Sequence, residues 1–273
     1  MTKLRALIVG GTSGIGHGIA LALAGRGNVE ITIAGRSKER GESIVQELSG
    51  VSSEHQHKFV AVDGFDLNSV KKLVEPNNSP DILVMTQGMA TLQGYTPTKD
   101  GIDQKLQLHY FSRFYLFRLL APHMKPNSRI LTVLSGGVHG RYNNYSSDFE
   151  LREGYSAVNA ADAAGYYTDA GFEALSKEYP ELVVAHAAPG FVNTRWGSEF
   201  PTLLRTMIVR PMMRLIGRDF KECGNTLVSA LMGLPRGYSV VDPKGKVVEN
   251  GLKHKTEDQS IILEKTLALL PDL

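Results

Sequence analysis

The chain has 273 residues, of which 42% are hydrophobic and 21% are charged, and its formal net charge is +2. A charge this small argues against nucleic acid or bulk membrane electrostatics as the main partner. A single cysteine, Cys223, excludes an internal disulfide framework and suits a reducing compartment.

The length and composition fit one α/β domain over residues 1–273, with a large core. The first predicted strand starts almost at Met1, so we expect no signal or transit peptide and a cytoplasmic location. No uninterrupted apolar run is long enough to span a bilayer, so no transmembrane segment is predicted.

A buried strand and a glycine-rich turn open the chain. The apolar run Leu4–Val9 breaks into this turn, and apolar residues at helical spacing then continue to residue 24. Strand, glycine turn and helix together are typical of a dinucleotide site, where backbone N–H groups and a helix N-terminus face the pyrophosphate. By itself the pattern also fits a tight turn without a ligand. The predicted phosphate-site residues are Gly10, Thr12, Ser13, Gly14, Ile15 and Gly16.

The second predicted strand, residues 29–34, ends without an acid. NAD-specific folds usually carry a carboxylate there for the ribose hydroxyls, but Gly35 occupies the position and Arg36 follows. Arg36 is suited to pair with a 2′-phosphate, and Lys38 adds charge. The sequence therefore favours NADP(H); the alternative is that both cations are solvated at a helix start.

The remaining pattern alternates strands and helices. Further strands are predicted at 57–62, 81–87, 129–135, 182–188 and 238–241, and further helices at 37–48, 68–73, 100–120, 220–234 and 257–270. This order predicts a doubly wound parallel sheet of about seven strands with helices on both faces. Its ligands are expected across the carboxyl ends of the strands.

The glycine spacing and a second segment resemble the short-chain dehydrogenase/reductase family. That segment is Pro189-Gly190-Phe191-Val192-Asn193-Thr194, and the long insert after Ser135 is similar to the retinol-dehydrogenase-like branch. The resemblance implies that this segment wraps the nicotinamide end of the cofactor. The expected residues there are Pro189, Gly190, Val192 and Thr194.

The same resemblance implies the adenosine contacts. Asp66 and Leu67 match a family pair that holds the adenine, although Asp66 also suits a helix N-cap and the two roles are compatible. Gly88 is the one residue retained from the family's N-N-A-G motif, and its backbone is expected near the adenosine ribose.

Ser135 matches the family's catalytic serine, whose hydroxyl bonds the substrate carbonyl oxygen. It follows a predicted central strand, where open α/β sheets bind ligands; a turn serine is the alternative. His109 stands where the branch places a catalytic-tetrad asparagine. A packed helix histidine is the alternative reading of that position.

The family's tyrosine and lysine, four residues apart, are not found as a pair. Starting from Tyr155 puts Asn159 in the lysine position. Reading back without a gap from the helix end at 174–178 puts Ala161 at the tyrosine and Gly165 at the lysine, and we prefer this register. The ordinary proton relay is therefore absent or rebuilt.

Asp162 and Tyr155 are the candidates for rebuilding it. Burial of Asp162 without a partner would raise its pKa and suit a proton donor; the alternative is an outer-face Asp162 or one paired with Arg141. The loss is similar to that in some fungal natural-product members of the family, one of which relies on an aspartate. The predicted catalytic residues are Ser135, Asp162 and Tyr155.

Residues 195–218 are predicted to cover the substrate. They are strongly apolar with interleaved arginines, and Pro211 is expected to divide them into two helices. Methionines in such a cover adapt to varied apolar shapes, so we expect a bulky hydrophobic substrate. An amphipathic patch on a membrane surface or against another subunit is the alternative.

Together these features predict an NADP(H)-dependent reductase that acts on a carbonyl or imine of a bulky apolar molecule, in secondary metabolism. The alternatives are a cyclase or isomerase that keeps the cofactor site without net redox chemistry, and a non-catalytic NADP-binding protein. No metal site is predicted, and a homodimer or homotetramer is expected from the family resemblance.

Overall fold

The computed structural model describes residues 3–75, 78–194, 197, 199–248 and 254–271. Within these residues the predicted parallel sheet is confirmed, with seven strands in the order β3-β2-β1-β4-β5-β6-β7. All adjacent strands are parallel. The strands are β1 (Leu4–Val9), β2 (Val29–Gly35), β3 (Lys58–Ala61), β4 (Ile82–Met85), β5 (Arg129–Val133), β6 (Val183–Ala187) and β7 (Gly237–Val241).

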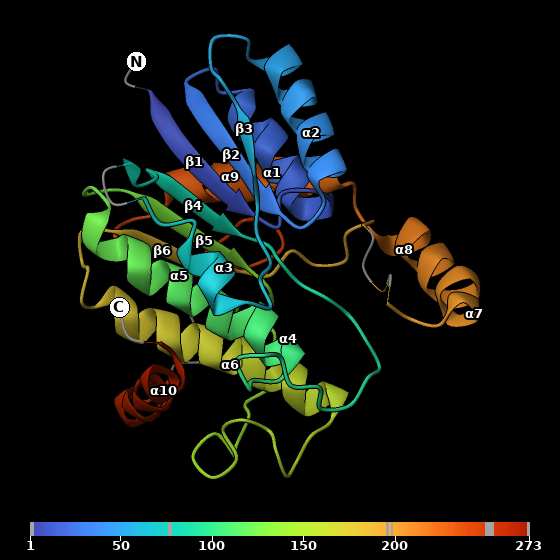
Figure 1. The fold of residues 1–273 in the computed structure, drawn as a ribbon, viewed down its shortest axis with the longest axis vertical. Coiled ribbons are helices and arrows are strands. Elements are labelled where there is room, and N and C mark those ends of the chain that lie inside the picture. The colour runs from blue at the N-terminus through green and yellow to red at the C-terminus, as the bar shows by residue number, and fades with distance from the viewer. Residues whose placement is uncertain (1–2, 76–77, 195–196, 198, 249–253, 272–273) are drawn as a thin grey trace.

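Helices cover both faces of the sheet (Figure 1). One face packs on α1 (Gly14–Ala24), α2 (Lys38–Val51) and α9 (Phe220–Gly233). The other packs on α3 (Leu67–Lys71), α5 (Ser112–Leu120) and α6 (Ala157–Ser176), with α10 (Thr256–Leu269) against α6. Because Cβ atoms alternate along a strand, Ala6 and Ile8 enter the first core, whereas Leu7 and Val9 enter the second.

The strand order reverses between β1 and β4, and this reversal positions the site. The chain runs outward from β1 to β3 and then crosses back to β4. The loops after β1 and β4 therefore diverge and leave a crevice at the carboxyl ends, where α/β sheets of this type bind ligands.

The long helix predicted from residue 100 begins at Gln104 instead. It runs through α4 (Gln104–Leu106), the π-helical turn η2 (Gln107–Phe111) and α5, and a 3₁₀ turn, η3 (Ala121–His123), follows. Asp103 caps its first turn by accepting the N–H groups of Lys105 and Leu106, at 2.9 and 3.4 Å. Asp100 instead accepts the N–H of Leu67.

The predicted cover segment is a helical arm that projects from the sheet (Figure 1). It comprises α7 (Thr202–Leu204), the π-helical turn η4 (Arg205–Val209) and α8 (Arg210–Ile216), which follow one another without a break. The predicted division at Pro211 is therefore wrong. Pro211 is the second residue of α8, which directly follows the π-helical turn η4, so the helical run continues through it. Arg195, the predicted start of the segment, lies outside the described residues.

None of the described helices is both long enough and apolar enough to cross a membrane.

Helices α1 and α9 approach closely at two glycines. A Cβ on Gly224 would collide with the backbone of Gly18. Because these are backbone atoms, they cannot move aside as the end of a flexible side chain could. We expect Gly224→Ala to lower the free energy of unfolding by about 1–3 kcal/mol. Gly50→Ala is the matched control, because nothing lies within 4 Å of its added methyl group in α2. It should be neutral or raise stability by up to ~1 kcal/mol. Urea unfolding of both variants checks this, and equal effects would contradict the close packing.

Candidate cofactor and active site

The glycine turn after β1 is shaped for close backbone approach. Gly10 has a φ of +85°, and a Cβ there would lie 2.5 Å from the backbone nitrogen of Gln87. Gly14 has a φ of +56°, and its Cβ would lie 3.1 Å from the Thr194 side chain. The two segments predicted to hold the phosphates and the nicotinamide end therefore meet at Gly14 and Thr194.

The first turn of α1 is suited to an anion. Ser13 is its N-cap in an extended conformation, its side chain makes no capping hydrogen bond, and the turn contains no acid. The first N–H groups of a helix have no partner within the helix, so here they are available to a phosphate. Gly16 packs against Thr86, where a Cβ would lie 2.5 Å from Oγ1, and half-buried Ile15 packs against the core.

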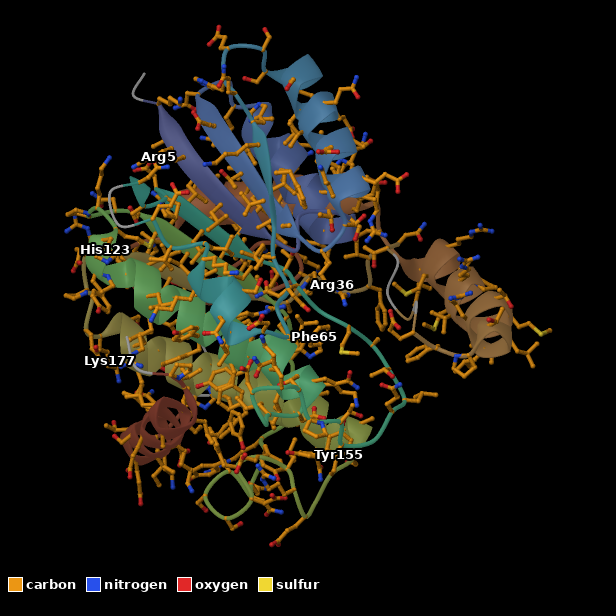
Figure 2. The ribbon with its side chains drawn as sticks, in the orientation of Figure 1. Arg5, Arg36, Phe65, His123, Tyr155 and Lys177 are labelled. Carbon is orange, nitrogen blue, oxygen red and sulfur yellow. The ribbon has the colours of Figure 1, made fainter. Side chains whose placement is uncertain are left out.

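At the carboxyl end of β2, the acid of an NAD-specific site would crowd the Thr12 side chain. A Cβ on Gly35 would lie 2.8 Å from the Thr12 side chain, so a carboxylate there would displace Thr12. Arg36 is exposed, and its guanidinium carbon lies 5.2 Å from the centroid of the Phe65 ring (Figure 2). Within the described chain no carboxylate lies within 4 Å of Arg36, whereas Lys38 pairs with Glu42 at 3.7 Å.

The predicted adenine residues lie at the start of α3. Asp66 is the N-cap and accepts the N–H of Asn68 at 2.9 Å, so the capping role is observed. Its carboxylate also pairs with Lys99 at 2.6 Å, and this hydrogen bond lowers the Asp66 pKa. Leu67 is buried. A cavity of about 340 Å³ adjoins them, lined by Asp63, Phe65, Asp66, Thr96, Pro97, Thr98, Lys99 and Gln104.

His109 lies in the π-helical turn, beside Gly88. Its Nε2 accepts the N–H of Met89 at 3.0 Å, and a Cβ on Gly88 would lie 3.3 Å from the same nitrogen. Burial lowers the pKa of His109 to about 3, with further contributions from the charges of Arg113 and Lys105. The ring is therefore neutral, and it holds the backbone where β4 leaves the sheet. Single π turns often mark functional sites.

The Pro189–Thr194 segment is held by the strand and arm around it. Gly190 has a φ of +68° and lies against Pro243. Val192 is buried and forms a parallel bridge with Arg218, beyond the end of α8. The segment thus connects the end of β6 with the arm.

Ser135 follows β5, and its hydroxyl is buried without a hydrogen-bond partner among the described residues. Its N–H donates to Nε2 of His186 at 3.1 Å. A Cβ on Gly165 would lie 2.5 Å from the Ser135 Oγ and 2.6 Å from the His139 side chain. The gapless register puts the family's lysine at Gly165, and no lysine stem fits at this contact.

Asp162 supports the loop that follows Ser135. It is half-buried, and Oδ1 accepts the N–H of Gly140 at 2.8 Å. Arg141, the cation considered for it, pairs with Asp258 at 3.2 Å. Ala161, which takes the tyrosine position in the same register, is exposed.

Tyr155 has a lysine partner that sequence reasoning missed. Its hydroxyl is hydrogen-bonded to Lys105 Nζ, which also donates to the carbonyl of Gln93 at 2.6 Å. Burial raises the pKa of Tyr155 to about 12 and lowers that of Lys105. Figure 2 shows Tyr155 near the start of α6, away from Arg36. Within the described chain, no hydrogen bond joins Tyr155 to Ser135 or Asp162.

The sequence also did not predict a buried polar cluster that contacts the backbone of Ser135 through His186. Asp169 Oδ1 accepts from His186 Nδ1 and from the Tyr238 hydroxyl, both at 2.5 Å, and Oδ2 lies 2.7 Å from His139 Nε2. Burial would raise the Asp169 pKa, but the facing histidines hold it well below its usual range. Burial lowers the His186 pKa, so this ring is neutral, accepts from Ser135 and donates to Asp169.

The parallel sheet, the open helix terminus and the glycine turn define a Rossmann-type nucleotide-binding fold. The sequence profile of the short chain dehydrogenases matches residues 4–201. The chain belongs to this family.

Relatives and solved structures agree with that assignment. The chain is 28% identical to the oxidoreductase AN1596 of Emericella nidulans, covering 92% of this chain and 78% of that one. It is 29% identical to the provisionally named daunorubicin C-13 ketoreductase DnrU of a Streptomyces species, covering 70% and 67%.

An uncharacterised protein of Mycobacterium paratuberculosis superposes with a TM-score of 0.72 at 20% identity, over 98% and 93% of the two chains. A short chain dehydrogenase of Burkholderia cenocepacia in complex with NADP superposes with a TM-score of 0.65 at 18% identity, over 89% and 98%. At these identities the likeness shows the fold.

The low pKa of His109 predicts an acid sensitivity. The unfolded histidine titrates near 6.5 and the folded one near 3, so between these values the unfolded chain binds one more proton. Stability is therefore lost as the pH falls below about 6.5. We expect His109→Asn to reduce proton uptake on unfolding by up to about one proton. Unfolding free energies from pH 7.5 to 4.5 check this. His123→Asn, at an exposed histidine, is the control, and equal slopes for both variants would contradict the assignment.

Proposed function

We propose that the protein is an NADP(H)-dependent reductase of a carbonyl or imine in a bulky apolar molecule. The observation that carries the cofactor choice is the end of β2. There an acid at Gly35 would crowd Thr12, and Arg36 is left without a carboxylate within 4 Å in the described chain. A 2′-phosphate would give the Arg36 guanidinium a charge-assisted partner.

The cradle residues fit a dinucleotide. Gly10 and Gly14 leave backbone room that side chains would fill, and the first turn of α1 offers N–H groups without an acid nearby. The backbone near Val192 would hold the carboxamide, and Thr194, beside Gly14, the phosphates. NADPH, when bound, supplies a hydride to the substrate carbon.

For the proton we propose Tyr155, with Lys105 in place of the family's lysine. The ammonium donates to the phenol oxygen and to the Gln93 carbonyl, which leaves the phenol proton free for the substrate oxygen or nitrogen. The lysine charge then stabilises the phenolate that remains. Ser135, whose hydroxyl has no hydrogen-bond partner in the described chain, would orient the substrate by donating to its carbonyl oxygen.

Asp162 is the second candidate for the proton donor. Its Oδ1 accepts from the Gly140 backbone, and it lies in α6 next to Ala161, where the family carries its tyrosine.

The apolar arm supports the substrate class. Leu203, Met207 and Leu215 are 71%, 69% and 86% exposed, so the arm carries an open apolar surface that suits a bulky apolar molecule. The name ketoreductase carried by the Streptomyces relative agrees with carbonyl reduction. A role in secondary metabolism is part of the same proposal. A cytoplasmic location and pairing into dimers or tetramers belong to the same proposal.

Cofactor choice is testable without a substrate. We expect Arg36→Ala to weaken NADPH binding by about 10- to 100-fold, the range for losing a charged hydrogen-bond partner, and to change NADH binding by less than about 2-fold. Calorimetric titration with both dinucleotides measures this. Lys38→Ala is the matched control and should have a smaller effect, because Lys38 pairs with Glu42. Equal losses for NADPH and NADH would contradict the role of Arg36.

Proton delivery is tested by single-turnover NADPH oxidation with a panel of apolar ketones, aldehydes and imines. Tyr155→Phe and Lys105→Met should slow turnover by about 10²- to 10⁴-fold and leave NADPH binding unchanged. A loss in Asp162→Asn with full activity in Tyr155→Phe would move the role to Asp162. If Ser135→Ala and all three other variants keep the parent rate, the proposed site is wrong. Product without NADPH consumption would indicate a cyclase or isomerase.

A further inference from the structure

We propose that the buried cluster at Asp169 is a zinc-type site, in which Asp169 Oδ2, His139 Nε2 and His254 Nε2 hold one divalent cation. The three ligand atoms lie within 4.8 Å of one another. The side chains of Asp169, His139 and His254 are 1%, 1% and 2% exposed. The proposal does not depend on the reductase activity.

His254 is the residue that points to a missing ligand. Its Nε2 is buried and has no hydrogen-bond partner in the described chain. The nearest carboxylate oxygen, Asp169 Oδ2, is 3.7 Å away, which is too long for a hydrogen bond. A buried ring nitrogen that faces a carboxylate but forms no hydrogen bond with it lowers the stability of the fold. A cation between the two would give both atoms a partner.

The groups around the ligands orient them as metal sites require. His139 Nδ1 lies 2.9 Å from the carbonyl of Gly140, which fixes the ring so that Nε2 faces Asp169. His186 and Tyr238 both donate to Asp169 Oδ1, so this oxygen is satisfied and Oδ2 remains for a cation. Ligating histidines and carboxylates are usually held by such outer hydrogen bonds.

Two imidazoles and one carboxylate in a dry site favour Zn²⁺ over Mg²⁺ or Ca²⁺, which prefer oxygen ligands. A tetrahedral zinc with bonds of about 2.0–2.1 Å keeps its ligand atoms about 3.3 Å apart. The 2.7 Å between His139 and Asp169 must therefore widen slightly, and His254 must move inward. The cation would replace the proton that lies between His139 and Asp169, and a solvent molecule would complete the coordination.

The ligands come from three separate parts of the fold. His139 lies in the loop after β5, Asp169 in α6, and His254 just before α10. A cation at this point would fasten the C-terminal helix to the loop that carries Ser135. The spacing of the three residues along the chain matches no short metal motif, which is why the sequence predicts none.

Metal binding tests this on the whole chain. After removal of metal with a chelator and dialysis against zinc chloride, we expect about one zinc per chain by elemental analysis, and a raised melting temperature. Cobalt(II) should give the strong visible absorption of a tetrahedral site. His254→Gln removes no hydrogen bond of Nε2 within the described chain, so we expect it to fold normally. It should bind zinc at least about 100-fold more weakly and lose the thermal shift.

His123→Gln is the matched control, because it makes the same change at an exposed histidine outside the cluster. Asp169→Asn should also abolish binding. A folded parent protein that takes up no zinc overturns the proposal and leaves a hydrogen-bonded His139–Asp169 pair. Zinc binding that His254→Gln leaves at the parent affinity also overturns it, because the zinc is then held elsewhere. Neither result bears on NADPH oxidation.

Discussion

A single buried carboxylate, Asp169, organises the part of the core that lies next to Ser135. A buried charge is costly unless it is paired and hydrogen-bonded, and here β6, β7 and the loop after β5 each contribute a partner. One of those partners, His186, holds the backbone of Ser135. The position of the Ser135 hydroxyl therefore depends on the Asp169 carboxylate, which is itself buried in the core. Removal of the Asp169 carboxylate would leave three buried groups, on His186, Tyr238 and His139, without this hydrogen-bond partner.

The glycine turn and the parallel sheet could be predicted from the sequence because their requirements are local. Gly10 and Gly14 need positive φ and open space, and both demands follow from the turn between one strand and the next helix. The parallel sheet follows from the alternation of strands and helices. Arg36 after Gly35 is also a local pattern, but the packing of Thr12 against that glycine, where an acid would crowd it, comes from the fold.

The polar contacts around Tyr155 and Asp169 could not be predicted in the same way, because they join distant parts of the chain. Lys105 meets Tyr155 from another helix, 50 residues away, and neither position has a motif that predicts the pair. The start of that helix was misplaced because two acids compete for the cap. Asp103 accepts the first N–H groups, while Asp100 is used by Leu67. In the sequence, Asp169 is one polar residue in an apolar helix. Its hydrogen-bond partners are distant along the chain, so only the folded structure identifies them.

The glycine at position 165 limits what a single substitution can restore. In the gapless register this is the position of the family's lysine, and a side chain there would have to enter a volume that Ser135 and His139 fill. Gly165→Lys would therefore displace His139, which would also lose its bond to the buried Asp169. Engineering the family's lysine into this protein would need a rebuilt loop after β5 as well as the new residue.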